Sequence, residues 1–140
     1  MEIVLNLVDR LLAELSNDPA DGVNRAVVTP QLIGAPDRFA AFLALDDHGT
    51  AVGVVTVTNA VAAYAGGGYG IISELYVDPA HRSAGVGRQL LDAARAEAKA
   101  RGWTRLEVTA PPDSRWDRTF AFYQRNGFVF TGRKLKYLVR

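Results

Sequence analysis

The sequence predicts an α/β domain in which a mixed β-sheet is packed between helices. Three observations support this prediction. Apolar residues recur at helical spacing near the start of the chain, and two strand-like runs joined by turn residues come next. After about residue 70, strand-like and helix-like segments alternate. Hairpins combined with strand–helix units favour a mixed sheet over an all-parallel one.

The first segments of the chain predict two helices. Apolar residues recur every three or four positions between Ile3 and Leu15, and Asn17-Asp18-Pro19 ends this helix. A second, shorter helix is expected over residues 24–33. Pro30 lies inside that segment and weakens the helical pattern, because proline lacks the N–H that a helix needs.

Strand patterns begin after this helix. Phe39–Leu45 and Val52–Thr58 predict a hairpin, because Asp46-Asp47-His48-Gly49 between them has the residue types of a turn. The stretch from Ala60 to Gly70 ends in closely spaced glycines and predicts a permissive loop. Ile71–Val77 then predicts a third strand.

The remaining segments alternate in type. A helix is expected after Gly85 and Gly87, with basic residues in its last turn and Gly102 just beyond its end. The later elements are a strand over 105–109, a helix over Trp116–Arg125, and a strand pair over 128–131 and 134–139. No shift in composition marks a boundary, so residues 1–140 are predicted to form a single domain.

Composition excludes several classes of function. The chain has 140 residues and no cysteine, which rules out disulfides, thiolate zinc sites and cysteine nucleophiles. Two histidines are too few for a histidine-based metal cage, so no metal is expected. A formal net charge of +1 gives no sign of a nucleic-acid partner. With no signal peptide and no long apolar run, we expect a cytoplasmic protein without a membrane partner.

The segment after the third strand has the features of an anion site. A tight turn leads into a helix whose first N–H groups have no intrahelical partner. Such groups bind phosphate, and glycine at 85 and 87 would let the phosphate approach the backbone. Arg82 and Arg88 would add charge-assisted contacts. The pattern therefore predicts a phosphate or pyrophosphate site.

Three other interpretations of Gly85 and Gly87 fit the sequence less well or no better. Taken alone, the pair is equally compatible with a glycine-rich helix start that binds nothing. The chain lacks the Gly-Lys-Ser/Thr of a Walker loop. A dinucleotide fingerprint fits less well, because Asp78–Ala84 separate the strand from the first glycine.

Two motifs together resemble a known family. Arg82-x-x-Gly85-x-Gly87, following Leu75-Tyr76-Val77-Asp78-Pro79, resembles the acetyl-CoA-binding motif of the GNAT acetyltransferase superfamily. Phe120–Phe128 is similar to a later helix of that family, with its Phe-Tyr and Gly-Phe pairs. The resemblance spans Phe39 to the C-terminus. It implies a GNAT-type mixed, mostly antiparallel central sheet flanked by helices, with acetyl-CoA as co-substrate.

The sequence departs from the family pattern in three places. Ser83 stands where the family often has glycine, and Ala84 where it often has lysine or arginine. The family also usually begins with a strand, whereas this chain has a helical pattern from Ile3, which leaves the first strand without a counterpart. The open sheet edge would then need a loop or a partner chain to shield it, as in a homodimer.

The resemblance also implies roles for individual residues. Main-chain groups at the end of the third strand would bind pantetheine, and the amides of the following turn would hold the pyrophosphate. The implied cofactor contacts are Leu75, Tyr76, Val77, Arg82, Ser83, Ala84, Gly85, Val86, Gly87 and Arg88.

Two side chains are candidates for catalysis. Tyr123 matches the family position whose hydroxyl lies near the CoA sulfur, which makes it the candidate acid; alternatively it is a core tyrosine. Glu74 is the candidate base, acting directly or through water, or else an ordinary rim carboxylate. Strand alternation places Glu74 on one face with Ile72 and Tyr76.

The resemblance implies an acetyl-CoA-dependent N-acetyltransferase. Its acceptor would be a primary amine on a small molecule or a protein. The alternative is a catalytically inactive CoA-binding or sensor module of the same fold, because fold does not guarantee activity.

Overall fold

The computed structural model describes residues 1–139. The chain forms two compact units, Met1–Glu107 and Val108–Arg140. The first unit contains α1 (Glu2–Ser16), α2 (Arg25–Ile33), β1 (Phe39–Leu45), β2 (Ala51–Ala62), β3 (Gly67–Val77) and α3 (Val86–Ala100). β4 (Leu106–Val108) ends at the first residue of the second unit, which also contains α4 (Asp117–Arg125).

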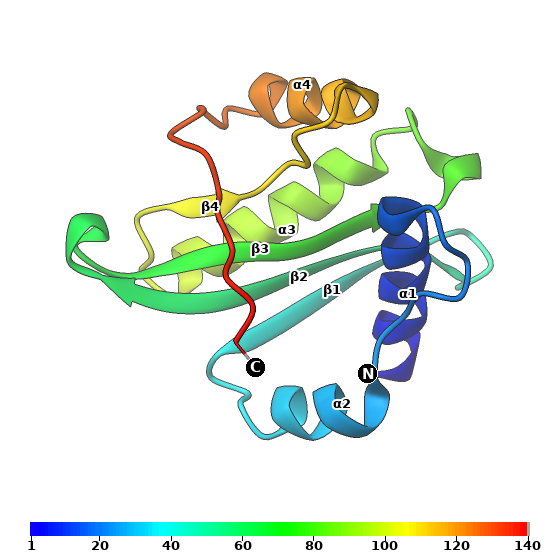
Figure 1. Cartoon of the computed structure of the whole chain (residues 1–140), viewed down its shortest axis with the longest axis horizontal. Helices are drawn as coiled ribbons and strands as arrows, with labels where there is room; N and C mark the ends of the chain where they lie inside the picture. The colour runs from blue at the N-terminus through cyan, green and yellow to red at the C-terminus, as the bar shows by residue number, and fades with distance from the viewer. Residues whose placement is uncertain (140) are drawn as a thin grey trace. The chain divides into compact units, whose positions relative to one another are not determined.

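The four strands form one sheet in the order β1-β2-β3-β4 (Figure 1). β1 pairs with β2, and β2 with β3, in antiparallel register. This mostly antiparallel sheet between helices confirms the predicted fold class. Within residues 1–139 no strand precedes α1, so β1 lies at one edge of the sheet.

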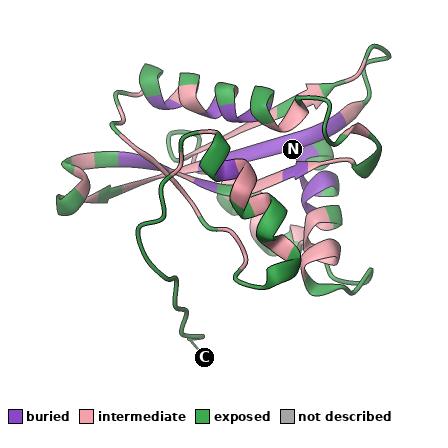
Figure 2. Cartoon of the chain, turned by 90° about the horizontal axis from the view of Figure 1, so that it is seen from above, coloured by how far each residue is buried: buried purple, intermediate pink, exposed green. Residues whose placement is uncertain are grey.

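The helices α1 and α3 cover opposite faces of the sheet. A buried apolar cluster joins α1 to one face, and its members are Val4, Leu7, Val8, Val54 and Tyr76. Gly53, next to Val54, faces the other side, where a Cβ atom would lie 3.0 Å from Leu90 of α3. Glycine here lets α3 pack closely on β2, and Figure 2 shows the buried side of that helix turned toward the sheet.

Both long helices end where the sequence predicts. The chain leaves α1 through Asn17 in the left-handed conformation, at φ 57°. After α3, Gly102 adopts φ 73°, a conformation that glycine accepts without steric cost. The predicted second helix and the first hairpin are also present, with Pro30 retained inside α2.

The loop predicted over residues 60–70 is wrong. β2 continues to Ala62 and β3 begins at Gly67, joined by a single 3₁₀ turn. Gly70 serves close packing, because a Cβ there would lie 2.6 Å from the ring of Trp103, whereas Gly66 and Gly67 adopt positive φ angles of 76° and 128° at the end of the turn. A glycine-rich strand that packs under an aromatic ring has the same composition as a loop, which explains the error.

The strand pair predicted over 128–131 and 134–139 is also wrong. The second unit has no strand in these segments within the part of the chain that the structure describes. Their apolar side chains are largely exposed, up to 91% for Leu135. Alternating apolar residues favour a strand only where a neighbouring strand supplies hydrogen bonds, and sequence alone does not reveal that partner.

Candidate active site

The turn before α3 presents a row of unused backbone donors. Ser83 and Gly85 adopt positive φ angles of 66° and 83°, which turns successive N–H groups outward. The first helical bond is from Gln89 N to Gly85 O, at 3.1 Å. Arg82–Gly85 form a hydrogen-bonded turn, but among the residues that the structure describes no backbone acceptor lies at normal hydrogen-bond geometry for the N–H groups of 83–88. These groups, at the positive end of α3, form a site suited to an anion.

The backbone at the end of β3 also offers free polar groups. In an antiparallel ladder, alternate residues bond to the partner strand and those between them point away. Asp78 N donates to Val52 O of β2 at 2.8 Å. The main-chain N–H and C=O of Tyr76, two residues earlier, therefore also point toward β2. The N–H and C=O groups of Leu75 and Val77 point away from β2; of these, the Val77 carbonyl accepts a hydrogen bond from Arg82 Nε at 2.9 Å.

The strand β4 is too short to cover those groups. Gly70 N donates to Arg105 O at 3.1 Å, which fixes β4 beside the start of β3. The three residues of β4 extend about 10 Å beyond Arg105, whereas Leu75 lies about 16 Å beyond Gly70. The edge of β3 at Leu75 and at the Val77 N–H is thus left unpaired by β4, as a ligand that lies alongside the strand requires.

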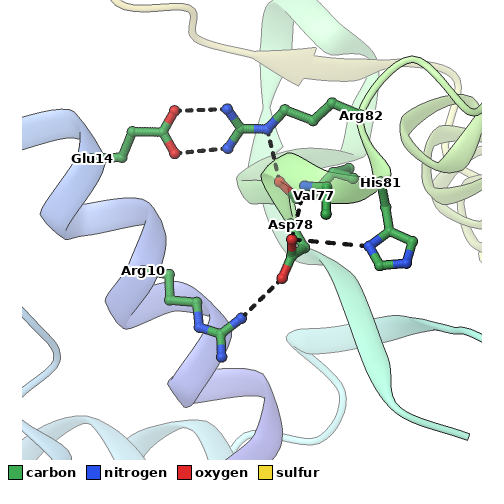
Figure 3. A network of polar contacts seen from close by, with 7 residues as sticks. Arg10, Glu14, Val77, Asp78, His81 and Arg82 are labelled. Carbon is green, nitrogen blue, oxygen red and sulfur yellow. Dashed lines mark hydrogen bonds and ion pairs between the residues drawn. The ribbon is translucent and has the colours of Figure 1, made fainter.

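Arg82 is engaged within the chain (Figure 3). Its Nε donates to the carbonyl of Val77 at 2.9 Å, and its two terminal nitrogens donate to the carboxylate of Glu14 at 3.0 and 2.7 Å. The bonds to Glu14 raise the pKa of Arg82 above its ordinary value. Arg82 therefore ties the turn before α3 to α1 and to the end of β3, and a phosphate bound there would compete with Glu14 for it.

A second contact fixes the same turn. Asp78 accepts a hydrogen bond from Ala80 N at 3.0 Å and one from Arg10 of α1 at 3.3 Å, and His81 Nδ1 lies 3.9 Å from its carboxylate (Figure 3). Arg88 is exposed, and no partner for its guanidinium is found within residues 1–139. Of the two predicted cations, Arg88 is the one left available.

A β-bulge positions Glu74. Glu74 pairs with Thr56, whereas Ile72 pairs with the next residue of β2, so Ser73 has no counterpart in the ladder. Glu74 shares its face with Tyr76, as predicted, but the bulge moves Ile72 to the opposite face. Simple alternation could not predict this, because the extra residue shifts the pleat by one position.

Thr56 orients the Glu74 carboxylate. Its side chain is buried, with 1% exposed, and its hydroxyl donates to Glu74 Oε2. The same hydroxyl accepts a hydrogen bond from Glu74 N at 3.0 Å. Among the described residues Oε1 has no comparable partner, so one carboxylate oxygen is held and the other can accept a proton.

Glu74 lies at the wall of a cavity of about 340 Å³ in the first unit. Its polar lining includes Glu74, Ser73 and Thr58, and the Ser73 and Thr58 hydroxyls lie 3.1 Å apart. Its apolar lining comes from α1, α2 and Phe39 of β1, which pairs with Thr58. A carboxylate in the wall of a small, mainly apolar cavity is an arrangement that can accept a proton from a bound molecule.

An ion-pair latch, Asp9 with Arg25, holds a loop that forms part of the wall of this cavity. Asp9 of α1 accepts a hydrogen bond from Val23 N at 2.7 Å and pairs with Arg25 at 2.7 Å. The hydrogen bond from Arg25 holds the pKa of Asp9 below its ordinary value. The latch fixes the loop of Gly22–Asn24, which forms part of the cavity wall.

We predict that Asp9→Asn lowers the free energy of unfolding by about 1 kcal/mol at pH 7, because the charged pair and part of the loop contact are lost. Folding lowers the pKa of Asp9. Its contribution to the free energy of unfolding is therefore fully present above the pKa of the unfolded state, and it is lost as pH falls through the pKa of the folded state. Urea unfolding at pH 7 and below pH ~4 measures both effects. Asp21→Asn, in the exposed part of the same loop, is the control, and equal losses in the two variants would contradict the latch.

Tyr123 belongs to the second unit. It lies in α4 with 7% of its surface exposed, between the rings of Phe122 and Phe128 at centroid distances of 5.4 and 5.6 Å. Burial raises the pKa of Tyr123 to about 12, so its hydroxyl is protonated throughout the neutral range. No hydrogen bond to that hydroxyl is found in the part of the chain that the structure describes. It is thus a proton-bearing group without an intrachain partner.

The family is decided by sequence comparison. The sequence model of the acetyltransferase (GNAT) domain matches residues 37–130, about two thirds of the chain. The chain belongs to the GNAT acetyltransferase family. A comparison with curated protein sequences gave no match.

Solved structures share the GNAT fold with this chain. An aminoglycoside acetyltransferase from an uncultured soil metagenomic sample is 22% identical with a TM-score of 0.77, covering 95% of this chain and 88% of its own. A ribosomal-protein-alanine N-acetyltransferase from Brucella melitensis biovar Abortus 2308 is 20% identical with a TM-score of 0.68, covering 99% and 91%. A transcriptional regulator from Bacillus halodurans C-125 is 22% identical with a TM-score of 0.79, covering 99% and 95%.

Within residues 1–139, no group of three or more His, Cys, Asp or Glu side chains is arranged to hold a metal ion. In the same residues no helix has both the length and the apolar character needed to cross a bilayer.

Sequence analysis missed several residues of this GNAT site. Thr56 is one, although a threonine inside the apolar run of β2 is a signal that could have been used. Glu14, which pairs with Arg82, and the latch residue Asp9 lie on the polar side of α1 and carry no local signal. Their partners come from distant parts of the chain, so only the fold brings each pair together.

Proposed function

We propose that this GNAT chain transfers the acetyl group of acetyl-CoA to a primary amine. The observation that supports this most strongly is the row of unpaired N–H groups at 83–88, next to the open edge of β3. Those groups fit a diphosphate and the β3 edge fits an extended, amide-containing arm, which are the two polar parts of CoA. Leu75, Val77 and the turn amides would hold the molecule, with Arg88 beside them.

Acetyl-CoA supplies the acetyl group as a thioester when it is bound. The chain must then remove a proton from the amine and supply one to the departing thiolate. We assign the first task to Glu74, directly or through a water, because Thr56 fixes the carboxylate in the wall of the cavity. As the C–N bond forms and the C–S bond breaks, the amine proton passes to Glu74.

We assign the second task to Tyr123. Its position in the family motif and its protonated hydroxyl support this role. A phenol with a pKa of about 12 is a weak acid, so it acts mainly by donating a hydrogen bond to the thiolate that forms, and the thiolate then takes its proton from solvent.

We predict that Tyr123→Phe lowers kcat roughly 10- to 100-fold while leaving acetyl-CoA affinity unchanged. Since Tyr123 loses its proton only as pH rises through about 12, the same factor should apply at every pH between 6 and 9.5. Steady-state kinetics over that range measures it. Phe122→Leu on the same helix is the control for disturbed packing, and a Tyr123→Phe enzyme with wild-type kcat would remove the assigned role.

We also propose that residues 1–140 act as one domain. The family match runs across the boundary between the two compact units, and the three solved structures cover 95–99% of the chain. A stable product of limited proteolysis that ends near residue 107 and binds CoA as tightly as the full chain would contradict this.

The alternative is a CoA-binding module without catalysis, and one structural neighbour is described as a transcriptional regulator. A sensor needs neither an oriented carboxylate nor a protonated tyrosine, and the chain has both. The test is release of free CoA thiol from acetyl-CoA in the presence of a panel of primary amines. We expect thiol release that depends on the amine; tight CoA binding without any release would favour the module.

A further inference from the structure

The cavity beside Glu74 contains one charged group and is otherwise dominated by apolar side chains. α1 contributes Val4 and Val8, α2 contributes Val28 and Leu32, and Phe39 lies at the start of β1. Among the described residues that line the cavity, Glu74 is the single charged side chain. The volume of about 340 Å³ is at the small end of the range for ligand pockets.

This lining sets a limit on the charge of a bound acceptor. An ammonium group taken out of water is costly unless a carboxylate or several acceptors compensate it. Glu74 can compensate one such group. A polycationic amine, such as an aminoglycoside, would bring further ammonium groups against apolar walls without partners.

A neighbouring hollow does not supply the missing carboxylates. It has a volume of about 410 Å³ and shares Gly22, Val23 and Asn24 with the cavity. Its lining includes two carboxylates: Asp21 lies in the exposed part of the loop, and Asp9 is already engaged by Arg25 and by the backbone of the loop. The charge of Asp9 is thus neutralised within the chain.

We infer that the acceptor is a small monoamine with an apolar body, whose nitrogen lies at Glu74 and whose carbon skeleton lies between α1, α2 and β1. This inference rests on the proposed transferase function and adds the substrate class to it. It departs from what the name of the aminoglycoside acetyltransferase neighbour would suggest for this chain. Burial of the apolar carbon skeleton of the amine supplies the affinity. Glu74 orients the amine by binding its nitrogen.

A matched pair of amines tests this. Hexylamine and 2-(2-aminoethoxy)ethanol have the same length and one amine each, but only hexylamine has an apolar body. We expect kcat/KM for hexylamine to exceed that for the ether amine roughly 10- to 100-fold, and kanamycin to be poorer still. Equal or better use of the ether amine or of kanamycin would overturn the inference.

Adjacent residues of α2 provide the matched variants. Val28 lines the cavity, whereas Val27 is 52% exposed and does not. Val28→Asp should reduce the preference for hexylamine at least roughly tenfold, and Val27→Asp should leave it unchanged. Leu32→Asp with Ile33→Asp as its control repeats the comparison if Val28→Asp does not fold. The same effect in a variant and its control would overturn the assignment of the cavity.

A binding measurement separates failure of this inference from failure of the transferase proposal. Titration calorimetry of the two amines into protein saturated with CoA involves no reaction. Tighter binding of hexylamine, weakened by Val28→Asp, supports the cavity even if no amine is acetylated, a result that would refute the transferase proposal alone. Equal binding of the two amines would overturn the inference even in an active enzyme.

Discussion

Replacing Gly85 with alanine should weaken acetyl-CoA binding roughly 100-fold. Gly85 has φ 83°, and an L-residue there costs about 1–2 kcal/mol, so the turn will move toward an ordinary conformation. That movement redirects the N–H groups of 83–88. Loss of one or two charge-assisted hydrogen bonds to a diphosphate is sufficient for the expected effect. Titration calorimetry with CoA measures it.

Gly49 offers a matched control for this substitution. It has φ 79° in the hairpin turn between β1 and β2, and like Gly85 it has no atom within 4 Å of an added Cβ. Gly49→Ala should therefore lose a similar few degrees of Tm without any change in CoA affinity. If the two variants bind CoA equally well, the diphosphate does not lie at this turn.

Replacing Glu74 with glutamine should lower kcat roughly 100- to 1000-fold, the usual size of a general-base contribution. Glutamine preserves the shape of the side chain and can still accept the Thr56 hydroxyl, but it cannot take a proton from the amine. The KM for acetyl-CoA should stay within about twofold, because Glu74 faces the cavity and not the turn before α3. Steady-state kinetics at saturating amine separates the two parameters.

Glu107→Gln is the control for the loss of a carboxylate in the same sheet. Glu107 lies on β4, where it accepts a hydrogen bond from Tyr64 at 2.7 Å, and it does not line the cavity. Its replacement should leave kcat unchanged. An active Glu74→Gln enzyme, or one that fails only through loss of acetyl-CoA affinity, would show that Glu74 is a structural carboxylate.

Local patterns predicted most of the fold. The helix over α1, the first hairpin and the glycine-initiated α3 depend on periodicity, turn residues and glycine, which are properties of short segments. The errors arose where a segment depends on a distant partner. Position 70 is glycine because the ring of Trp103 leaves no room for a Cβ atom. The segment over 128–139 would need a partner strand in order to form a strand, and its own residues do not specify one.

The candidate site divides in the same way. The turn before α3 and its backbone donors were predictable, because they follow from helix geometry and from the glycine at position 85; that they bind an anion stays a prediction. The cavity was not, because its walls come from α1, α2, β1, β2 and β3. The role of Arg82 was predicted only in part. Its charge is apparent in the sequence, but its pairing with Glu14 depends on the packing of α1.

The most direct test is a CoA titration followed by ¹H–¹⁵N NMR of the backbone amides. If the unpaired donors of 83–88 bind the diphosphate, their amide resonances should shift first and furthest, along with those of Leu75 and Val77. The hairpin-turn amides near Gly49 should not move. Saturable CoA binding that leaves the 83–88 resonances in place would contradict the account.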